Sequence, residues 1–204
     1  MLNVYTICPT DYFGSNCYLV GDADSWAVID PSVSYQSAVQ KYPEITGNIK
    51  LVLLTHAHFD HIYAIDSWAK VCDKIIVGAA DARMLSDSIL NCYLGFLGID
   101  SGYMGAYTTV DDGDTLALGP YTVSVISTPG HTQGSVCYKV DNGPVFTGDT
   151  LFSSGSYGRC DLPGGDEDAL WASLFKLLSK NMLGKFYPGH GYPDTFENTI
   201  NYFN

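Results

Sequence analysis

The 204-residue sequence predicts a mixed α/β sandwich built as a single domain. Short apolar, β-branched runs alternate with helical stretches in both halves of the chain, and no low-complexity run or linker separates them. The hydrophobic content of 46% and the charged content of 16% are typical of a globular protein. A chain of this length buries roughly 70% of the surface that its unfolded form exposes. We therefore expect one domain over residues 1–204.

The predicted strands are short runs rich in β-branched and aromatic residues, and several of them end in Gly, Asp or Pro. They are Val4–Ile7, Cys17–Val20, Trp26–Ile29, Ile49–Leu54, Lys74–Val77, Tyr121–Ser127, Ser135–Val140, Val145–Thr147 and Lys185–Tyr187.

The predicted helices are Tyr35–Lys41, His61–Val71, Ala80–Ser86 and Glu167–Leu178. In the last of these, leucines recur at helical spacing from Leu170 to Leu178, and Asp166 is placed to cap the helix. A final helix is expected to start at Asp194, because Asp194 and Glu197 have the spacing of a capping box. The Gly- and Tyr-rich segment 88–114 predicts a long loop with a short helix, which we interpret as a possible lid.

Charge and composition exclude several classes of function. Ten Lys and Arg against 22 Asp and Glu give a net charge of −12, which disfavours nucleic acid as a partner. No apolar run is long enough for a signal peptide or a membrane span, so we expect a cytoplasmic protein without a membrane partner. The six cysteines lack C-x-x-C spacing, which indicates free thiols and neither a zinc ribbon nor a disulfide framework.

A cluster of metal-ligating residues follows the predicted strand Ile49–Leu54 directly. It reads Thr-His-Ala-His-Phe-Asp-His at residues 55–61. Side chains at i and i+2 of an extended segment point the same way, so His56 and His58 can share one ion. The turn into the next helix would direct Asp60 and His61 toward a second ion. Imidazole and carboxylate ligands together suit zinc and similar divalent metals.

An isolated histidine is more often a surface or core residue than a ligand, and Asp60 has the alternative of capping the following helix. The remaining histidines and Asp149 favour metal ligands over these alternatives. The two histidines outside the cluster, His131 and His190, each follow a Pro-Gly pair at the end of a predicted strand. Asp149 ends another strand, and one carboxylate can bridge two metals about 3.5–4 Å apart. All these residues are thus expected at strand ends, where active sites gather.

The ordered motifs resemble the metallo-β-lactamase superfamily, and within it the short hydroxyacylglutathione hydrolase (glyoxalase II)-like branch. They are THAHFDH at 55–61, TPGHT at 128–132, FTGDTLF at 146–152 and YPGHG at 187–191, and the resemblance runs from about Cys17 to Tyr192. It implies a four-layer αββα sandwich, classed as α+β, with the metals at one edge of the two sheets.

The resemblance also implies the roles of the residues. His56, His58 and His131 would form the first metal site, and Asp60, His61 and His190 the second. Asp149 would bridge them. The cofactors would be two divalent ions, zinc above all, with iron or manganese as alternatives. A hydroxide bridging the metals would attack a small-molecule thioester such as S-D-lactoylglutathione. The catalytic residues would be Asp60, which orients the hydroxide, and Asp149.

For substrate contacts, Arg159 and Tyr192 resemble a basic residue and a tyrosine that approach glutathione in glyoxalase II-like enzymes. An equally weighted alternative for Arg159 is an ion pair with Asp161. Little more than a terminal helix follows His190, so the helical extension that holds much of glutathione in longer members is missing. Thioester hydrolysis is therefore the expectation, and the identity of the thiol stays open.

The nearest rival function is a mononuclear iron persulfide dioxygenase of the same superfamily, which shares the first cluster and a Gly-Arg-x-Asp segment. The motif around His190 favours the hydrolase because it completes a second site. The acidic charge disfavours an RNA-processing nuclease. Lactonase and β-lactamase activities stay open, although enzymes acting on β-lactams usually lack the bridging aspartate. A binding module that has lost its metals is disfavoured, because the full ligand set is present.

Overall fold

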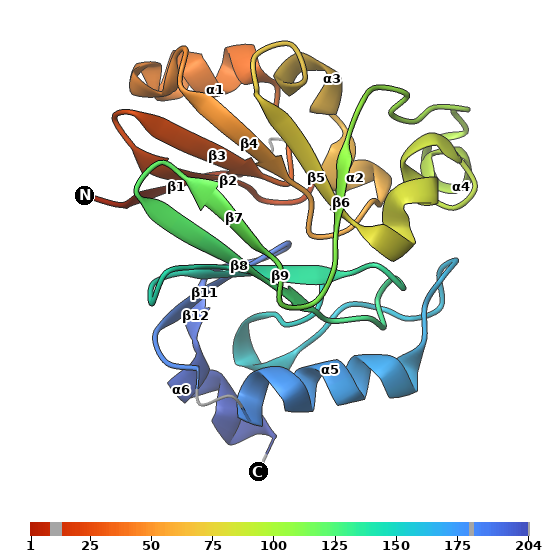
Figure 1. The fold of residues 1–204 in the computed structure, drawn as a ribbon. Helices are drawn as coiled ribbons and strands as arrows, with labels where there is room; N and C mark the ends of the chain where they lie inside the picture. Colours follow the sequence, from red (N-terminus) through yellow and green to blue (C-terminus); the bar gives the residue numbers. More distant parts are fainter. Residues whose placement is uncertain (9–13, 180–181, 204) are drawn as a thin grey trace.

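The computed structural model describes residues 1–8, 14–179 and 182–203 and confirms the predicted sandwich (Figure 1). Two six-stranded sheets face each other, and helices cover their outer faces. The first sheet has the strand order β1-β2-β3-β4-β5-β6, and the second has the order β12-β11-β10-β9-β8-β7. The chain therefore completes one sheet before it begins the other.

The first sheet is antiparallel at one side and parallel from β3 onward. Its strands are β1 (Asn3–Ile7), β2 (Cys17–Asp22), β3 (Ser25–Ile29), β4 (Ile49–Leu53), β5 (Lys74–Gly78) and β6 (Thr108–Val110). Parallel strands are covered on both faces and so consist of continuous apolar runs. In β3, Trp26 and Val28 face the outer helices, whereas Ala27 and Ile29 face the second sheet.

The second sheet is antiparallel except for the parallel pair β10 and β11. Its strands are β7 (Thr115–Leu118), β8 (Tyr121–Ser127), β9 (Val136–Val140), β10 (Val145–Gly148), β11 (Lys185–Pro188) and β12 (Asp194–Thr195). Because β8, β10 and β11 run in the same direction, their carboxyl ends lie at one edge of the sheet.

The helices are short apart from one. They are α1 (Tyr35–Lys41), α2 (Phe59–Ile62), α3 (Ile65–Trp68), α4 (Tyr93–Leu97), α5 (Glu167–Ser179) and α6 (Phe196–Thr199), with 3₁₀ turns at Pro43–Ile45, Ala79–Ser86, Ser153–Gly155 and Ile200–Tyr202. The predicted stripe of α5 is confirmed, since Leu170, Leu174 and Leu177 are buried. Asp166 caps α5 as predicted, because its Oδ1 accepts a hydrogen bond from the Ala169 amide (2.9 Å).

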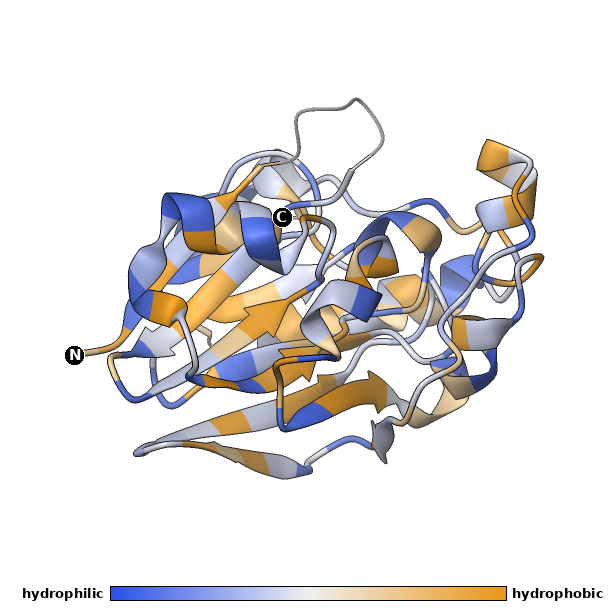
Figure 2. Ribbon diagram, turned by 90° about the horizontal axis from the view of Figure 1, so that it is seen from above, coloured by the Kyte–Doolittle hydropathy of each residue, from blue (hydrophilic) through white to orange (hydrophobic). Residues whose placement is uncertain are grey.

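Three apolar layers hold the sandwich together. The first lies between α1–α4 and the first sheet, the second between the two sheets, and the third between the second sheet and α5–α6. In Figure 2 the strands carry orange interrupted by white and blue, and the helices mix orange with blue. The sequence of layers is thus helix, sheet, sheet and helix, as the resemblance implies. Among the described residues, no helix has the length and apolarity that crossing a bilayer would demand.

Several predicted elements differ from the structure for identifiable reasons. The helix predicted over His61–Val71 is two separate turns, α2 and α3, because the Ala64 amide donates to the Pro31 carbonyl (2.9 Å) in place of a helical partner. The stretch predicted as a helix at Ala80–Ser86 is a 3₁₀ turn. The last helix is capped by Thr195, whose hydroxyl accepts from the Asn198 amide, and so begins after the predicted Asp194.

Three strands were not predicted: β6, β7 and β12 are short and lie at or near sheet edges, where exposed polar residues weaken the sequence signal. Segment 88–114 is a loop with a short helix, α4, as predicted, but it also contains β6. The predicted capping box at Asp194 is wrong, because Asp194 lies in β12 and its carboxylate accepts from the Ser154 and Thr195 amides.

Candidate metal centre

Loops from both sheets meet at the edge where β3, β4, β8, β10 and β11 end. The two sheets are joined there by hydrogen bonds. The Tyr138 hydroxyl donates to the Leu54 carbonyl (2.9 Å), and the Tyr18 hydroxyl donates to the Pro188 carbonyl (2.6 Å). The Val136 amide donates to the Thr55 carbonyl (2.8 Å). These bonds fix the loop after β4 against the loops of the second sheet.

All seven residues predicted as metal ligands lie at this edge. Their possible ligand atoms form three overlapping groups, and within each group the atoms lie within 4.8 Å of one another. The groups are His56, His58 and His131; Asp60, His61 and His190; and His56, His61 and Asp149. We refer to the first as the three-histidine group and to the second as the mixed group.

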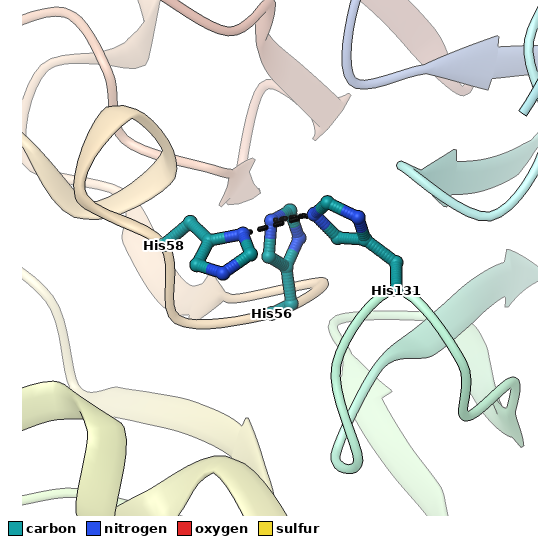
Figure 3. A group of neighbouring side chains, drawn as sticks. All are labelled: His56, His58 and His131. Atoms are coloured by element: carbon teal, nitrogen blue, oxygen red, sulfur yellow. Dashed lines mark hydrogen bonds between the residues drawn. The ribbon is translucent and has the colours of Figure 1, made fainter. Parts of the chain in front are cut away.

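The three-histidine group is buried, and its rings face one another (Figure 3). Nε2 of His131 lies 2.9 Å from Nδ1 of His58 and 3.2 Å from Nε2 of His56. The rings are nearly perpendicular in pairs, with centroids 4.6–4.8 Å apart. Three ring nitrogens from two different loops therefore converge on one point.

Hydrogen bonds behind the rings fix which nitrogen faces that point. The Arg159 carbonyl can only accept, so Nδ1 of His131 donates to it (2.7 Å) and leaves the Nε2 lone pair free. The Thr55 hydroxyl donates to Asp30 (2.7 Å), so its oxygen can accept from Nδ1 of His56 (3.2 Å). Metal-bound histidines are commonly held through the second ring nitrogen in this way.

The mixed group lies on the other side of His56. Nδ1 of His61 donates to Oδ2 of Asp30 (2.8 Å), which directs its Nε2 toward Oδ2 of Asp60, 3.6 Å away. Nε2 of His190 lies 3.2 Å from the same Asp60 oxygen. The His190 side chain is 40% exposed and so forms the solvent side of the centre.

The Asp149 carboxylate lies between the two groups. Its Oδ1 is 3.4 Å from Nε2 of His61, and its Oδ2 is 3.6 Å from Nε2 of His131 and 3.5 Å from Nε2 of His190. One carboxylate therefore reaches ring nitrogens of both groups, as a bridging ligand must.

The two groups differ in electrostatics. Burial, followed by the neighbouring imidazoles, lowers the pKa of His56, and burial together with His131 lowers the pKa of His58 to about 3. In the mixed group burial also acts to lower the pKa of the histidines, but nearby carboxylates outweigh it. The pKa of His61 is raised by Asp60, Asp30 and Asp149, and that of His190 by Asp149 and Asp60.

Unpartnered buried atoms test whether these residues fit a metal. Among the described residues, the buried side-chain nitrogen and oxygen atoms without a hydrogen-bond partner are Nε1 of Trp26, Nε2 of His58, Nε2 of His61 and Oδ1 of Asp149. Two of them, Nε2 of His61 and Oδ1 of Asp149, face each other at this centre, whereas Nε2 of His58 lies on the ring side opposite the Nδ1 that faces His131. A buried polar atom without a partner costs free energy, on the order of 1–3 kcal/mol. Nitrogen and carboxylate donors are ligands that zinc, iron and manganese accept, so the residues fit divalent cations.

Glycines allow the loops to approach the centre. A Cβ on Gly189 would lie 2.1 Å from Oδ1 of Asp149 and 2.7 Å from Cε1 of His61, so a side chain cannot be accommodated there. Gly130 has φ +140°, and a Cβ on it would lie 2.3 Å from the backbone of Leu170. The two Pro-Gly pairs before His131 and His190 therefore serve the close approach that the sequence suggests.

Two buried aspartates support the centre and were missed from the sequence. Asp30 contacts His61 and Thr55, and it adopts a left-handed φ of 51°, which aspartate tolerates better than most residues. Asp81 accepts from the Ala57 amide, the Gly134 amide and the Thr132 hydroxyl, and so connects the loop after β4 to the His131 loop. Asp30 ends a predicted strand, as the ligands do, which was an available signal. Asp81 lies in a predicted helix and gives none.

A cavity of about 300 Å³ opens at the centre. Residues from both groups line it, together with Asp149, Phe59, Phe96 and Arg159. The Arg159 side chain forms a bidentate ion pair with Asp161 (2.5 and 2.6 Å). Tyr192 is 83% exposed and is not among the residues that line the cavity.

Comparison with known proteins agrees with this arrangement. The sequence profile of the family described as the metallo-beta-lactamase superfamily matches residues 10–190. The probable metallo-hydrolase YqgX of Bacillus subtilis is 33% identical over 92% of this chain and 89% of its own length. The hydroxyacylglutathione hydrolase GloC of Haemophilus influenzae is 31% identical over 91% of this chain and 89% of its own length.

Solved structures are similar over nearly the whole chain. The B3 metallo-β-lactamase BLEG-1 superimposes with a TM-score of 0.88 at 29% identity, covering 98% of this chain and 97% of that one. The protein TTHA1623, solved in a di-iron-bound form, superimposes with a TM-score of 0.78 at 30% identity, with 96% of each chain covered. The αββα sandwich, the histidine-rich edge and the profile match over most of the sequence lead to one conclusion: this chain is a member of the metallo-β-lactamase superfamily.

Proposed function

We propose that the protein is a metal-dependent hydrolase with a centre for two divalent cations. His56, His58 and His131 would hold one cation, Asp60, His61 and His190 the other, and Asp149 both. The observation that carries this proposal is the pair of buried, unpartnered atoms on His61 and Asp149, which lie 3.4 Å apart beside the converging ring nitrogens of the three-histidine group. A cation would give these atoms the partners that the protein itself does not supply.

When bound, such cations supply Lewis acidity that polarises a carbonyl and lowers the pKa of a coordinated water toward about 7. The chain's own residues hold the ligands in register. Asp30 and the Arg159 carbonyl orient His61 and His131, and Asp60, beside His190, is positioned to orient a proton of the attacking water. Asp60 and Asp149 are the proposed catalytic residues.

The proposed substrate is a small-molecule thioester such as S-D-lactoylglutathione, hydrolysed in the cytoplasm. The likeness to GloC supports a thioester. Zinc is the proposed metal, with iron and manganese as alternatives that accept the same ligands. Arg159 and Tyr192 are the proposed contacts to the thiol portion. For Arg159 this requires the ion pair with Asp161 to open, because the guanidinium is engaged in it.

The test combines metal analysis with an activity panel. Protein purified without added metal is analysed for zinc, iron and manganese, and then assayed with S-D-lactoylglutathione, with other thioesters and with a persulfide while O₂ consumption is followed. Two metal ions per chain with thioester cleavage and no O₂ uptake is the expected result. One iron per chain with O₂ uptake on a persulfide would replace the proposal with the dioxygenase.

β-Lactam hydrolysis is a second candidate, because BLEG-1, a B3 metallo-β-lactamase, is similar over almost the entire chain. A chromogenic cephalosporin is therefore included in the same panel. Cleavage of the cephalosporin in preference to every thioester would favour this second function.

A further inference from the structure

An apolar wall lies beside the metal centre. Phe59, Cys92, Phe96 and Leu162 line one cavity together with the metal-centre residues, and we call these four side chains the acyl wall. Phe59 lies between His58 and Asp60 in the sequence, so the wall begins next to the ligands of both groups. Its ring stacks on that of Phe96, with centroids 5.4 Å apart and an angle of 26° between the planes.

The wall is supported from behind by the core. Phe59 and Cys92 are buried members of the outer apolar layer of the first sheet, and Leu162 packs against the same layer. Phe59 also contacts the Tyr93 ring, with centroids 5.7 Å apart. Leu162 comes from the second half of the chain, so the wall spans the same junction as the metal centre. A wall backed in this way keeps its shape when a ligand binds.

The wall continues onto the surface at α4. Phe96 lines the cavity and is also 45% exposed. Leu94 and Ile99 are similarly exposed, but Leu94 lines a separate cavity and neither residue lines this one. Large apolar side chains in water are unfavourable by about 25 cal/mol for each Å² that a ligand could cover. Phe96 therefore favours an apolar ligand that reaches from the cavity toward the surface.

The charge at the cavity also favours an apolar ligand. The Arg159 guanidinium is paired with the Asp161 carboxylate, so the cavity offers no unengaged guanidinium to an anionic group on this side. A substrate must place its scissile carbonyl at the metal centre, and the part next to the carbonyl then meets the wall.

We propose that the acyl wall selects thioesters with an apolar acyl chain, which lies across Phe59 and Phe96 and reaches the surface at Phe96. This inference rests on the proposed function, because it names the acyl class for the same centre. Each methylene that the wall covers is expected to strengthen binding about two- to fourfold, where fourfold corresponds to about 0.8 kcal/mol.

The test measures binding separately from hydrolysis. Straight-chain carboxylates from acetate to octanoate, which are the acid products of such thioesters, are titrated calorimetrically into the zinc-loaded protein. We expect affinity to rise with chain length in the wild type. Phe96→Ala and Leu162→Ala should largely remove this dependence. Phe175→Ala is the matched control, because Phe175 is a 59% exposed phenylalanine on α5 outside the cavity lining, and it should leave the dependence unchanged.

Affinity that is independent of chain length in the wild type would overturn the inference. So would equal effects of Phe96→Ala and Phe175→Ala, or a Phe96→Ala variant that changes only the oligomeric state, since a second copy would then be the occupant of α4. Hydrolysis of acetyl and octanoyl thioesters at equal rates would overturn the inference and leave the proposed function standing. Length-dependent binding without hydrolysis of any thioester would support the wall and overturn the proposed function.

Discussion

The three-histidine group and the mixed group lie side by side but are built differently. The first consists of imidazoles alone and is fully buried, and burial lowers the pKa of His56 and of His58. The second contains a carboxylate, is open to solvent at His190, and has histidine pKa values raised by its acidic neighbours. In the first group the lowered pKa values of His56 and His58 favour the neutral imidazoles that bind a cation, whereas in the second group a proton would compete with a cation for His61 and His190.

The largest loss of activity is expected from replacing Asp149, because its carboxylate is shared by both groups. Replacing Asp149 by Ala should lower kcat/KM on the order of a thousandfold, because metal polarisation of a substrate contributes several kcal/mol. Metal analysis should find at most one ion per chain. Asp24→Asn, at an exposed turn, is the control for the loss of one negative charge. Retention of two ions and full activity in Asp149→Ala would contradict the bridging assignment.

Replacing one histidine in each group compares how much the two histidines contribute to the free energy of unfolding. His131→Ala and His190→Ala should each lose about one ion per chain and most activity. In the metal-free proteins, unfolding by denaturant should distinguish them. His131→Ala leaves a hole in a buried site and should lower the free energy of unfolding by about 1–3 kcal/mol, whereas His190→Ala, at a partly exposed site, should change it by about 0.5 kcal/mol or less. Equal losses would show that the groups are equally embedded.

The two supporting aspartates, Asp30 and Asp81, allow the two groups to be tested separately, because each contacts one group more directly than the other. Asp30→Asn weakens the bond that orients His61, and Asp81→Asn weakens the links between the loops that carry His56 and His131. Loss of such support typically lowers metal affinity by about 10–100-fold. Competition with a chelator should show the loss for one ion in Asp30→Asn and for the other in Asp81→Asn. A loss of both ions in parallel would indicate a single coupled site.

Proton competition gives the smallest expected effect for a change of one pH unit, and its sign is defined. The pKa values of His61 and His190 are raised above the ordinary histidine value of about 6.5. As the pH is lowered, these imidazoles therefore take up a proton at a higher pH than an ordinary histidine does. As the pH falls through this range, the affinity of the mixed group should decrease by about tenfold per pH unit for each proton displaced. The three-histidine group should keep its cation. Metal release followed from pH 8 to pH 5 would check this order, and release of both ions at one pH would contradict it.

Much of the candidate centre could be predicted from the sequence, because the patterns that indicate each ligand lie within a few residues of it. The buried strand before His56, the Pro-Gly pairs before His131 and His190 and the strand before Asp149 each predict a ligand at a strand end. That all these strand ends share one edge comes from pairing across the two sheets, which the sequence alone does not specify. The structure brings the seven residues together, and their role as ligands stays a prediction until metal is measured.

What could not be predicted depends on contacts between distant segments. The break at Ala64 arises from a hydrogen bond to Pro31, and the cap at Thr195 from the position of Asp194 in a two-residue strand. Asp81 supports two loops that are far from it in sequence. The apolar wall likewise requires Leu162 and Phe59 to line one cavity. None of these contacts has a periodicity or a spacing that a reader of the sequence could recognise.

The division of the candidate ligands between the two halves has a consequence for how the protein matures. The loop after β4 supplies His56, His58, Asp60 and His61, and the second sheet supplies His131, Asp149 and His190. Neither half alone completes either group, so a cation held by these residues would be retained only by chains whose halves have docked in register. Metal occupancy would then report assembly as well as readiness for catalysis, and a newly made chain with misaligned sheets would remain empty and inert.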